Sequence, residues 1–540
     1  MLAAPDGNTS AWGAWSLVPP LVAIVLVMVT GRVIVSLLLS VAVAAVVLHG
    51  ASPLAALATF AETFLWQALA DEHYLRIVVF TSLMGAMVGL MHRGGGMQGL
   101  VDLITARIRS PRGGQLAGWG LGLVVFFDDY ANTLMLGTTL APWYDRLRIS
   151  RQKLAYIVDS TAAPVAGLAL VSTWVAAEVG YIQQGLDQLR FAQQANPFDL
   201  FVQTIPYRFY PLLALAMVGW VAFSGRDFGP MRRFEEAAGR RGPSKSAPEE
   251  PADTAAPWHG LFARKPPPRW QNAVLPVLVV LGVTLLLLAW TGHHALLQQQ
   301  RPGGSLWQWI RHGDAYVALV YASLAGMLCA WVLLRCQRML SPRECYWASV
   351  QGVLQVAPAL VILWLASALR RATGAEALDT GGYLAGLLQA HLDPRWLPTV
   401  VFLLAAAVSF ATGTSWGTMG ILMPLVIQTA HAMLGAGGEA VWPHDPIFLG
   451  AMAGVLAGSI FGDHCSPISD TTVLASLASG CPHMEHVWTQ LPYAVVVAVV
   501  SVLLGTLPAG WGISPWWGLL GGTVLLGLMV YGLGRRTNTR

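Results

Sequence analysis

Charged residues are scarce in this chain of 540 residues. Only 11% of the residues are Asp, Glu, Lys or Arg, whereas 55% are hydrophobic and the mean hydropathy is +0.56. Soluble domains carry about 25% charged residues, so the composition argues against a soluble fold. The net charge of +4 gives no sign of a nucleic-acid partner.

Cysteine is scarce as well, and the common motifs of enzymes are absent. The cysteines form no CxxC pair and no metal-ligand spacing, so neither a disulfide framework nor a structural zinc site is expected; they are Cys329, Cys336, Cys345, Cys465 and Cys481. The sequence has no HExxH zinc motif and no nucleophile–base signature. We therefore expect neither an enzyme nor a bound cofactor.

Long apolar runs are abundant. Each is close to the ~20 residues that cross the hydrocarbon core of a bilayer. The 22 Trp and 56 Gly also suit a membrane bundle, because indoles favour the interface and small residues let helices approach closely. The sequence predicts an all-α, multi-pass protein in contact with membrane lipid.

The predicted spans fall into two halves around a hydrophilic, Pro-rich segment. They cover residues 15–31, 33–50, 75–92, 154–177, 207–224, 272–291, 314–334, 347–369, 447–477, 489–508 and 513–534. We expect a first membrane repeat of about five spans at 1–225, a loosely packed linker at 226–271, a second repeat at 272–508, and a C-terminal helix with a basic tail at 509–540.

The distribution of positive charge predicts the orientation. An odd number of spans in each half makes the second repeat inverted, a common plan of secondary transporters. With the linker on the inside, most of the 32 Lys and Arg residues fall on that side, as the positive-inside rule demands. The N-terminus is then outside, and the linker and C-terminus are cytoplasmic.

Similar polar segments interrupt the two halves. The first half has FFDDYANTLMLGTTLAP at 126–142 and IVDSTAAPV at 157–165, and the second has FATGTSWGTMGILMP at 410–424 and FGDHCSPIS at 461–469. We expect a re-entrant hairpin at 114–141 and another at 397–428. Each is followed by a helix that breaks near an Asp and a Pro, and secondary transporters bind their substrates at such interruptions.

Asp463 is the strongest candidate for binding a cation. Gly462 and Pro467 are expected to break its helix, which leaves backbone carbonyls free. Ser466 would add a hydroxyl oxygen, and hard cations such as sodium prefer oxygen ligands. Asp470 is a further ligand candidate. For both carboxylates the alternative is a helix cap.

The other candidates carry a polar oxygen at a predicted hairpin tip or helix break. They are Asp159, Asp128, Asp129, Asn132, Thr133, Thr414 and Ser415. Capping is an equal alternative for Asp159, and small-residue packing is the alternative for the second tip. Glu178 is expected at the interface, His464 as a hydrogen-bonded spacer, and no Arg deep in a span.

Four strings of the sequence resemble the NhaC family of sodium/proton antiporters. They are GDHCSPISDTTVLAS at 462–476, ATGTSWGTMGILMP at 411–424, FDDYANTL at 127–134 and IVDSTAAPV at 157–165. The resemblance covers roughly residues 115–180 and 397–495. It implies a bacterial inner-membrane exchanger, a homodimer in which each protomer has a scaffold and a moving part built from two hairpins and two broken helices.

The resemblance also implies which residues form the cation site. It assigns a sodium site to Asp463, Ser466 and Asp470, with contributions from Asp129, Asn132, Thr133, Asp159, Thr414 and Ser415. We therefore expect sodium/proton exchange by alternating access. The alternative is a sodium- or proton-coupled carrier of an amino acid or a small organic anion, because similar proteins exchange malate and lactate.

Overall fold

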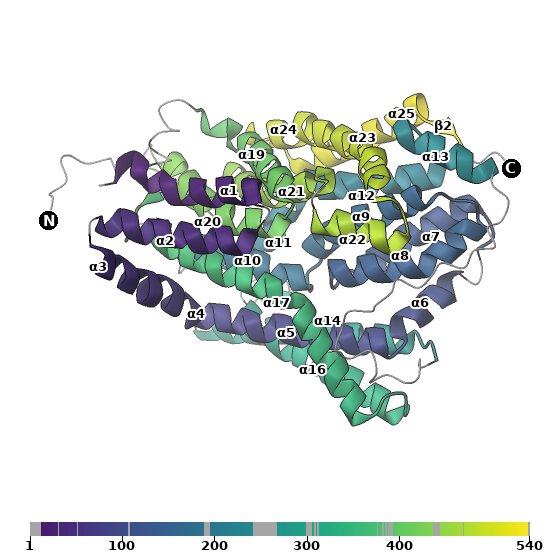
Figure 1. Cartoon of the computed structure of the whole chain (residues 1–540), viewed down its shortest axis with the longest axis horizontal. Coiled ribbons are helices and arrows are strands. Elements are labelled where there is room, and N and C mark those ends of the chain that lie inside the picture. The colour runs from purple at the N-terminus through teal and green to yellow at the C-terminus, as the bar shows by residue number, and fades with distance from the viewer. Residues whose placement is uncertain are drawn as a thin grey trace.

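The computed structural model is almost entirely helical, as the apolar runs predict. Most helices lie along the long axis of the molecule, with α3 at one end and α13 and β2 at the other (Figure 1). The structure describes residues 12–537 except 31, 51, 106–107, 188, 190–194, 241–266, 299–304, 307–308, 310–312, 375, 381–382, 384–385, 387–391, 436–442 and 468.

The first half of the chain contains the elements up to α13. They are η1 (Gly13–Leu17), α1 (Val18–Thr30), α2 (Val33–His49), α3 (Pro53–Ala58), η2 (Thr59–Trp66), α4 (Gln67–Leu69), α5 (Glu72–Arg93), α6 (Gly96–Thr105), α7 (Pro111–Val124), α8 (Asp129–Arg146), α9 (Arg151–Leu168), α10 (Thr173–Leu186), α11 (Pro197–Thr204), η4 (Ile205–Tyr207), α12 (Phe209–Ser224), β1 (Arg226–Asp227) and α13 (Gly229–Arg240).

The second half begins at α14. Its elements are α14 (Gln271–Gln298), α16 (Ala315–Cys336), α17 (Pro342–Thr373), η5 (Pro394–Trp396), α19 (Leu397–Thr412), α20 (Ser415–Gly435), α21 (Pro446–Cys465), α22 (Asp470–Ser479), α23 (His483–Ser501), η6 (Val502–Thr506), α24 (Leu507–Gly510), α25 (Pro515–Leu533) and β2 (Arg535–Arg536). The two short strands pair antiparallel, which joins the end of the first half to the end of the chain.

The helices confirm a multi-pass, all-α fold, whereas the exact layout of the two repeats stays a prediction. Among the described residues, nine helices are long and apolar enough to cross a membrane, or up to eleven if each of two bent pairs is one span. The bent pairs are α9 with α10 and the 197–207 segment with α12, at angles of 51° and 50°. α1 and α2 are shorter apolar helices. The short helices α3, α4 and α6 were not predicted.

Both predicted hairpins are helix pairs joined by a short turn. α7 and α8 meet at residues 125–128, and α19 and α20 meet at Gly413 and Thr414. Gly413 has a φ of +66°, a conformation that glycine adopts without steric cost. α19 and α20 are each long enough to cross a membrane, so a re-entrant path remains a prediction for that pair.

Both predicted helix breaks exist, but one is displaced. The second break lies at residues 466–469, next to Asp463 as expected. The first lies at residues 169–172, and α9 continues through Pro164. The expectation that the first helix breaks near Asp159 is therefore wrong. A proline removes one backbone donor, and tight packing holds the buried α9 together across that loss.

Glycines bring α19 and α21 into direct backbone contact. Four glycines at every fourth position of α21 face α19, namely Gly450, Gly454, Gly458 and Gly462. A Cβ at Gly458 would lie 2.3 Å from the carbonyl oxygen of Phe402, and one at Gly462 would lie 2.3 Å from that of Ala406. The second hairpin and the second broken helix therefore pack as one unit.

The start of the predicted linker is ordered rather than loosely packed. Residues 226–240 form β1 and α13, which packs against α9 and α23. Lys153 forms an ion pair with Asp227, which also accepts a hydrogen bond from Tyr493 at 2.9 Å. The Oε1 atom of Glu235 accepts the N–H of Ser150 at 2.8 Å. Buried polar contacts thus fix this end of the molecule; residues 241–266 lie outside the described chain.

The close α19–α21 contact predicts that a single methyl group added to Gly458 lowers the stability of the protein. Gly458→Ala should lower the melting temperature of the purified protein by several degrees, because overpacking against a backbone carbonyl costs about 1–3 kcal/mol. Gly282→Ala on α14 is the control, since its Cβ would meet nothing within 4 Å. Equal melting temperatures for the two variants would contradict the backbone contact.

Glu235 predicts a pH-dependent stability. It lies outside the predicted spans, and burial raises the pKa of its carboxyl from 4.5 to about 7. The folded state therefore favours the protonated acid, and stability is lost as the pH rises from about 4.5 through 7, at no more than about 1.4 kcal/mol per pH unit. Glu235→Gln should melt at a higher temperature than the wild type at pH 8 and at a similar one at pH 5.

Glu236→Gln is the matched control for this measurement. Glu236 is the neighbouring residue on α13 and forms a partly exposed ion pair with Arg232. Its replacement should change stability by less than about 1 kcal/mol. A difference between Glu235→Gln and the wild type that stays constant from pH 5 to pH 8 would refute the role of burial.

Candidate functional site

The break between α21 and α22 places Asp463 in the protein interior. Its side chain is buried in the last turn of α21, and its Oδ2 atom accepts a hydrogen bond from Thr471 at 2.9 Å. Its backbone carbonyl accepts the N–H of Ser466 at 3.1 Å, which closes the turn. Ser469 caps α22 by accepting the N–H of Thr472. The N-cap of α22 is therefore Ser469.

Asp159 reaches the same region from the middle of α9. It is fully buried, and its Oδ2 atom accepts hydrogen bonds from Thr472 at 3.2 Å, His486 at 3.2 Å and Gln490 at 2.6 Å. The hydroxyl of Thr472 also lies 3.4 Å from the carbonyl oxygen of Asp463. One hydroxyl group thus lies between the carboxylate of Asp159 and the backbone carbonyl of Asp463, although Asp159 is distant from the break in its own span. We call Asp159, Asp463, Thr472, His486 and Gln490 the Asp159–Asp463 cluster.

Ser466 and Asp470 complete the predicted sodium site only in part. Ser466 is fully buried in the break. Asp470 is the first residue of α22, and its side chain lies outside the part of the chain that the structure describes. The three predicted ligands are therefore close in sequence around one turn, and their common coordination stays a prediction.

The tip of the first hairpin contacts the first residues of α10. Thr173 donates a hydrogen bond from its hydroxyl to Asp128 Oδ2 at 3.0 Å and from its backbone N–H to the carbonyl of Phe127 at 3.0 Å. Asn132 donates to the carbonyls of Gly122 and Val125, at 3.0 and 2.9 Å. These bonds satisfy carbonyls at the end of α7, so the amide of Asn132 holds the tip in shape.

A pocket of about 170 Å³ lies between the two hairpin tips. Its wall includes Asp128 and Asp129 from the first tip, Thr414 from the second and Thr173 from α10. The opposite wall comes from α5 and α17, including Gln355. The predicted tip residues therefore do meet, in a pocket with acidic side chains.

The remaining tip residues are buried beside this pocket. Thr133 is buried in the first turns of α8. Ser415 donates a hydrogen bond to the carbonyl of Ser459 at 3.3 Å, and Ser409 donates to the same carbonyl at 2.6 Å. The second tip is thus tied to α21 one turn before Asp463. This contact joins the tip pocket to the Asp159–Asp463 cluster through one helix.

Two charged side chains lie in the protein interior. Glu178, which was expected at the interface, is buried in α10, and Arg208 is fully buried, although no Arg was expected deep in a span. The two side chains form an ion pair at 2.6 Å, and Arg208 also donates to the carbonyl of Gly167 at 2.5 Å. Arg208 lies in the bend between η4 and α12, which the hydropathy pattern does not reveal.

His486 and Gln490 are site residues that the sequence reasoning missed. Both lie on α23, and both are fully buried. The signal was available, because two polar residues four positions apart share one face of an apolar helix. His464, expected as a spacer, makes a hydrogen-bond contact of 3.0 Å with Tyr210 through Nδ1, and its carbonyl accepts from Gln490 at 2.9 Å.

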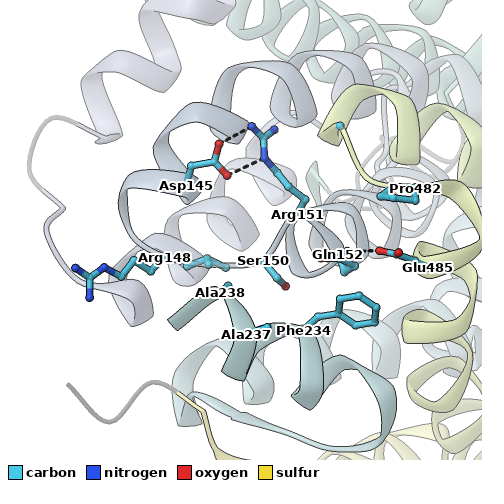
Figure 2. Close-up of a pocket in the computed structure, with 12 residues that line it drawn as sticks. Asp145, Arg148, Ser150, Arg151, Gln152, Phe234, Ala237, Ala238, Pro482 and Glu485 are labelled. Carbon is cyan, nitrogen blue, oxygen red and sulfur yellow. Dashed lines mark hydrogen bonds and ion pairs between the residues drawn. The ribbon is translucent and has the colours of Figure 1, made fainter. Parts of the chain in front are cut away.

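A larger pocket, of about 470 Å³, lies between the α8–α9 turn, α13 and the start of α23 (Figure 2). Arg151 forms an ion pair with Asp145 at 2.6 Å on one side of it. Gln152 donates to Glu485 at 2.6 Å on the other side. Gln152 and Glu485 belong to the helices that carry Asp159 and His486, so this pocket lies at the end of the α9–α23 contact.

The chemistry of the Asp159–Asp463 cluster is that of a cation site. Carboxylates, hydroxyls and backbone carbonyls are the oxygen ligands that hard cations prefer. A buried carboxylate is costly unless a proton, a cation or hydrogen bonds compensate its charge. The cluster can therefore hold a proton or a small cation in the protein interior.

The chain is similar to several proteins of known sequence. The family model described as "Na+/H+ antiporter family" matches residues 165–511. An uncharacterized protein of Haemophilus influenzae is 31% identical over 525 residues, which cover 97% of this chain and 96% of that protein. The Na(+)/H(+) antiporter NhaC of Alkalihalophilus pseudofirmus is 31% identical over 118 residues, covering 21% of this chain and 23% of that protein.

Two further similarities concern substrate and fold. The Malate-2H(+)/Na(+)-lactate antiporter of Bacillus subtilis is 34% identical over 139 residues, covering 24% of this chain and 27% of that protein. The solved structure of the Neisseria gonorrhoeae transporter MtrF has a TM-score of 0.56 at 16% identity, covering 95% of this chain and 96% of that one. The fold is therefore that of a polytopic transporter, and the chain belongs to the Na+/H+ antiporter family.

Proposed function

We propose that this secondary transporter exchanges sodium for protons across the bacterial inner membrane. The observation that supports this best is the pair of buried residues Asp159 and Asp463 at a helix break, where the Thr472 hydroxyl lies near the Asp159 carboxylate and the backbone carbonyl of Asp463. Charged groups inside a membrane are costly. The cluster is therefore most stable when a proton or a sodium ion compensates its negative charge, and the two compete for the same carboxylates.

Alternating access would then move this cluster relative to the rest of the protein. The second hairpin and α21 pack through glycines along their length, so α19, α20, α21 and α22 would move together. α8 and α9 pack against α22 and would move with them. These helices would meet a smaller electrostatic barrier when a proton or a sodium ion compensates the charge of the cluster than when its carboxylates are unpaired. Binding would thereby be coupled to movement.

The second candidate is a carrier of a small organic anion or amino acid coupled to sodium or protons. The pocket between the hairpin tips favours it, because Thr173 and Thr414 line it at the starts of helices. Helix N-termini attract anions. Asp128 and Asp129 line the same pocket and would repel an anion. This charge makes a cation the better substrate.

The orientation and assembly follow from charge and resemblance. We propose that the N-terminus is outside and that α13, the linker and the C-terminal tail are cytoplasmic, because this arrangement satisfies the positive-inside rule. We also propose a homodimer, as the NhaC resemblance implies.

Asp463→Asn tests the proposed exchange. In proteoliposomes with an internal pH-sensitive dye, the variant should lose sodium-dependent proton flux by about tenfold or more, because a charge-assisted ligand contributes about 1.5–3 kcal/mol. Asp102→Asn, on the exposed surface of α6, should keep the wild-type rate. A wild-type rate for Asp463→Asn would rule out the cluster as the coupling site.

The same proteoliposomes separate the two candidate functions. Lithium, potassium, malate and lactate are each supplied in place of sodium under the same pH gradient. Sodium alone should support proton movement in the wild type. Proton movement that requires an organic anion would favour the second candidate instead.

Cysteine labelling tests the orientation. Cys336 is exposed at the end of α16, whereas Cys345, Cys465 and Cys481 are buried. If the linker is cytoplasmic, α14 and α16 return the chain to the cytoplasmic side. A membrane-impermeant maleimide should therefore label Cys336 in inverted vesicles and leave it unlabelled in intact cells, with Cys336→Ser as the control. Labelling in intact cells would reverse the orientation.

A further inference from the structure

The two carboxylate oxygens of Asp159 have different surroundings. Oδ2 accepts hydrogen bonds from three side chains, whereas Oδ1 is buried and has no hydrogen-bond partner among the described residues. A buried acceptor without a donor costs free energy. Three donors on one oxygen hold the carboxylate in a single orientation and leave the other oxygen available.

Gln490 has the same asymmetry. Its Nε2 atom donates to Asp159 Oδ2 at 2.6 Å and to the carbonyl of His464 at 2.9 Å. Both partners are acceptors, so the amide nitrogen must face them and the amide oxygen must point elsewhere. Within the described chain this buried Oε1 also lacks a hydrogen-bond partner. Two oxygens without donors therefore belong to side chains that contact each other.

The hydroxyl residues of α23 bond within their own helix, unlike Gln490. Thr489, the neighbour of Gln490, donates to the carbonyls of Glu485 and His486 in its own helix, and Ser501 donates to the carbonyl of Val497. These hydroxyls are satisfied locally, as is usual for Thr and Ser in membrane helices. Gln490 instead reaches across to α9 and α21.

We propose that Gln490 is a ligand of the transported cation, binding it through Oε1 together with Asp159 Oδ1. Carboxylate and amide oxygens are both ligands of hard cations. His486 is a positioning residue, because its Nε2 contacts Asp159 Oδ2 at 3.2 Å and fixes the carboxylate. The inference rests on the proposed function and extends the cation site to α23, outside the hairpins and broken helices.

This site also lies towards the larger pocket. Gln152 and Glu485 line that pocket where α9 meets α23 (Figure 2). Asp159 lies seven residues beyond Gln152 on α9, about 10 Å along the helix. Gln490 lies in the same direction from Glu485. The α9–α23 contact therefore extends from this pocket to the proposed ligands.

The test uses two replacements of Gln490 in the full-length protein. Gln490→Met keeps the length of the side chain and removes the amide, so equilibrium binding of ²²Na⁺ to the purified protein should weaken about tenfold. Gln490→Glu keeps an acceptor oxygen in place of Oε1, and its other oxygen can donate to Asp159 when it carries a proton, so this variant should bind sodium within about threefold of the wild type. The half-saturating sodium concentration for proton flux should change in parallel, with a smaller change in the maximal rate.

Thr489→Val is the matched control and should bind ²²Na⁺ within about twofold of the wild type. His486→Gln and His483→Gln form a second matched pair on the same helix. His483 contacts Ser476 and the carbonyl of Pro467 rather than Asp159, so only His486→Gln should displace the pH profile of the exchange.

The outcomes separate this inference from the proposed function. A wild-type protein without sodium-dependent proton flux would overturn the proposed function. Wild-type flux with unchanged ²²Na⁺ binding in Gln490→Met would overturn the inference alone. If Gln490→Met is not monodisperse, Gln490→Glu decides: retained sodium binding supports the ligand role, and lost binding in a folded protein overturns it.

Discussion

The hydroxyl of Thr472 lies within hydrogen-bond distance of the Asp159 carboxylate and of the carbonyl at Asp463. In a bilayer every buried polar group needs a partner within the protein. Asp159 and Asp463 lie in different halves of the chain, 304 residues apart in the sequence. A broken helix supplies the partner, because α22 begins beside the end of α21 and turns Thr472 towards α9. The cluster depends on this geometry, and so does any movement that carries it.

Close packing through glycines joins the helices into two packed units. Glycines of α21 contact the backbone of α19, and another close contact joins Gly85 and Gly89 of α5 to Gly352 of α17. The pocket between the hairpin tips lies where these two packed units face each other. At the start of α9, Lys153 forms an ion pair with Asp227 of β1, and Glu235 of α13 accepts the N–H of Ser150. Protonation there would change how firmly α9 is held.

The comparison of sequence with structure is informative where they differ. Asp159 was predicted because its segment resembles the one around Asp463 in the second half. It does belong to the cluster, but it lies within a continuous helix and not at a break. Arg208 and Glu178 form a buried pair that hydropathy could not reveal, because a window average hides a single charged residue in an apolar segment. His486 and Gln490 were overlooked because none of the four strings that carry the family resemblance includes them, although both lie within the range that it covers.

The sequence by itself determined that this is a multi-pass helical transporter, where its spans lie and which polar strings interrupt them. These properties are local: apolar length sets a span, and glycine, proline and aspartate mark an interruption. The family follows from the same strings and from the relatives. Only the tertiary structure decided which polar atoms meet, because hydrogen bonds between α9, α22 and α23 depend on how distant helices pack. That packing brings Gln490 to Asp159, a contact that no spacing in the sequence predicts.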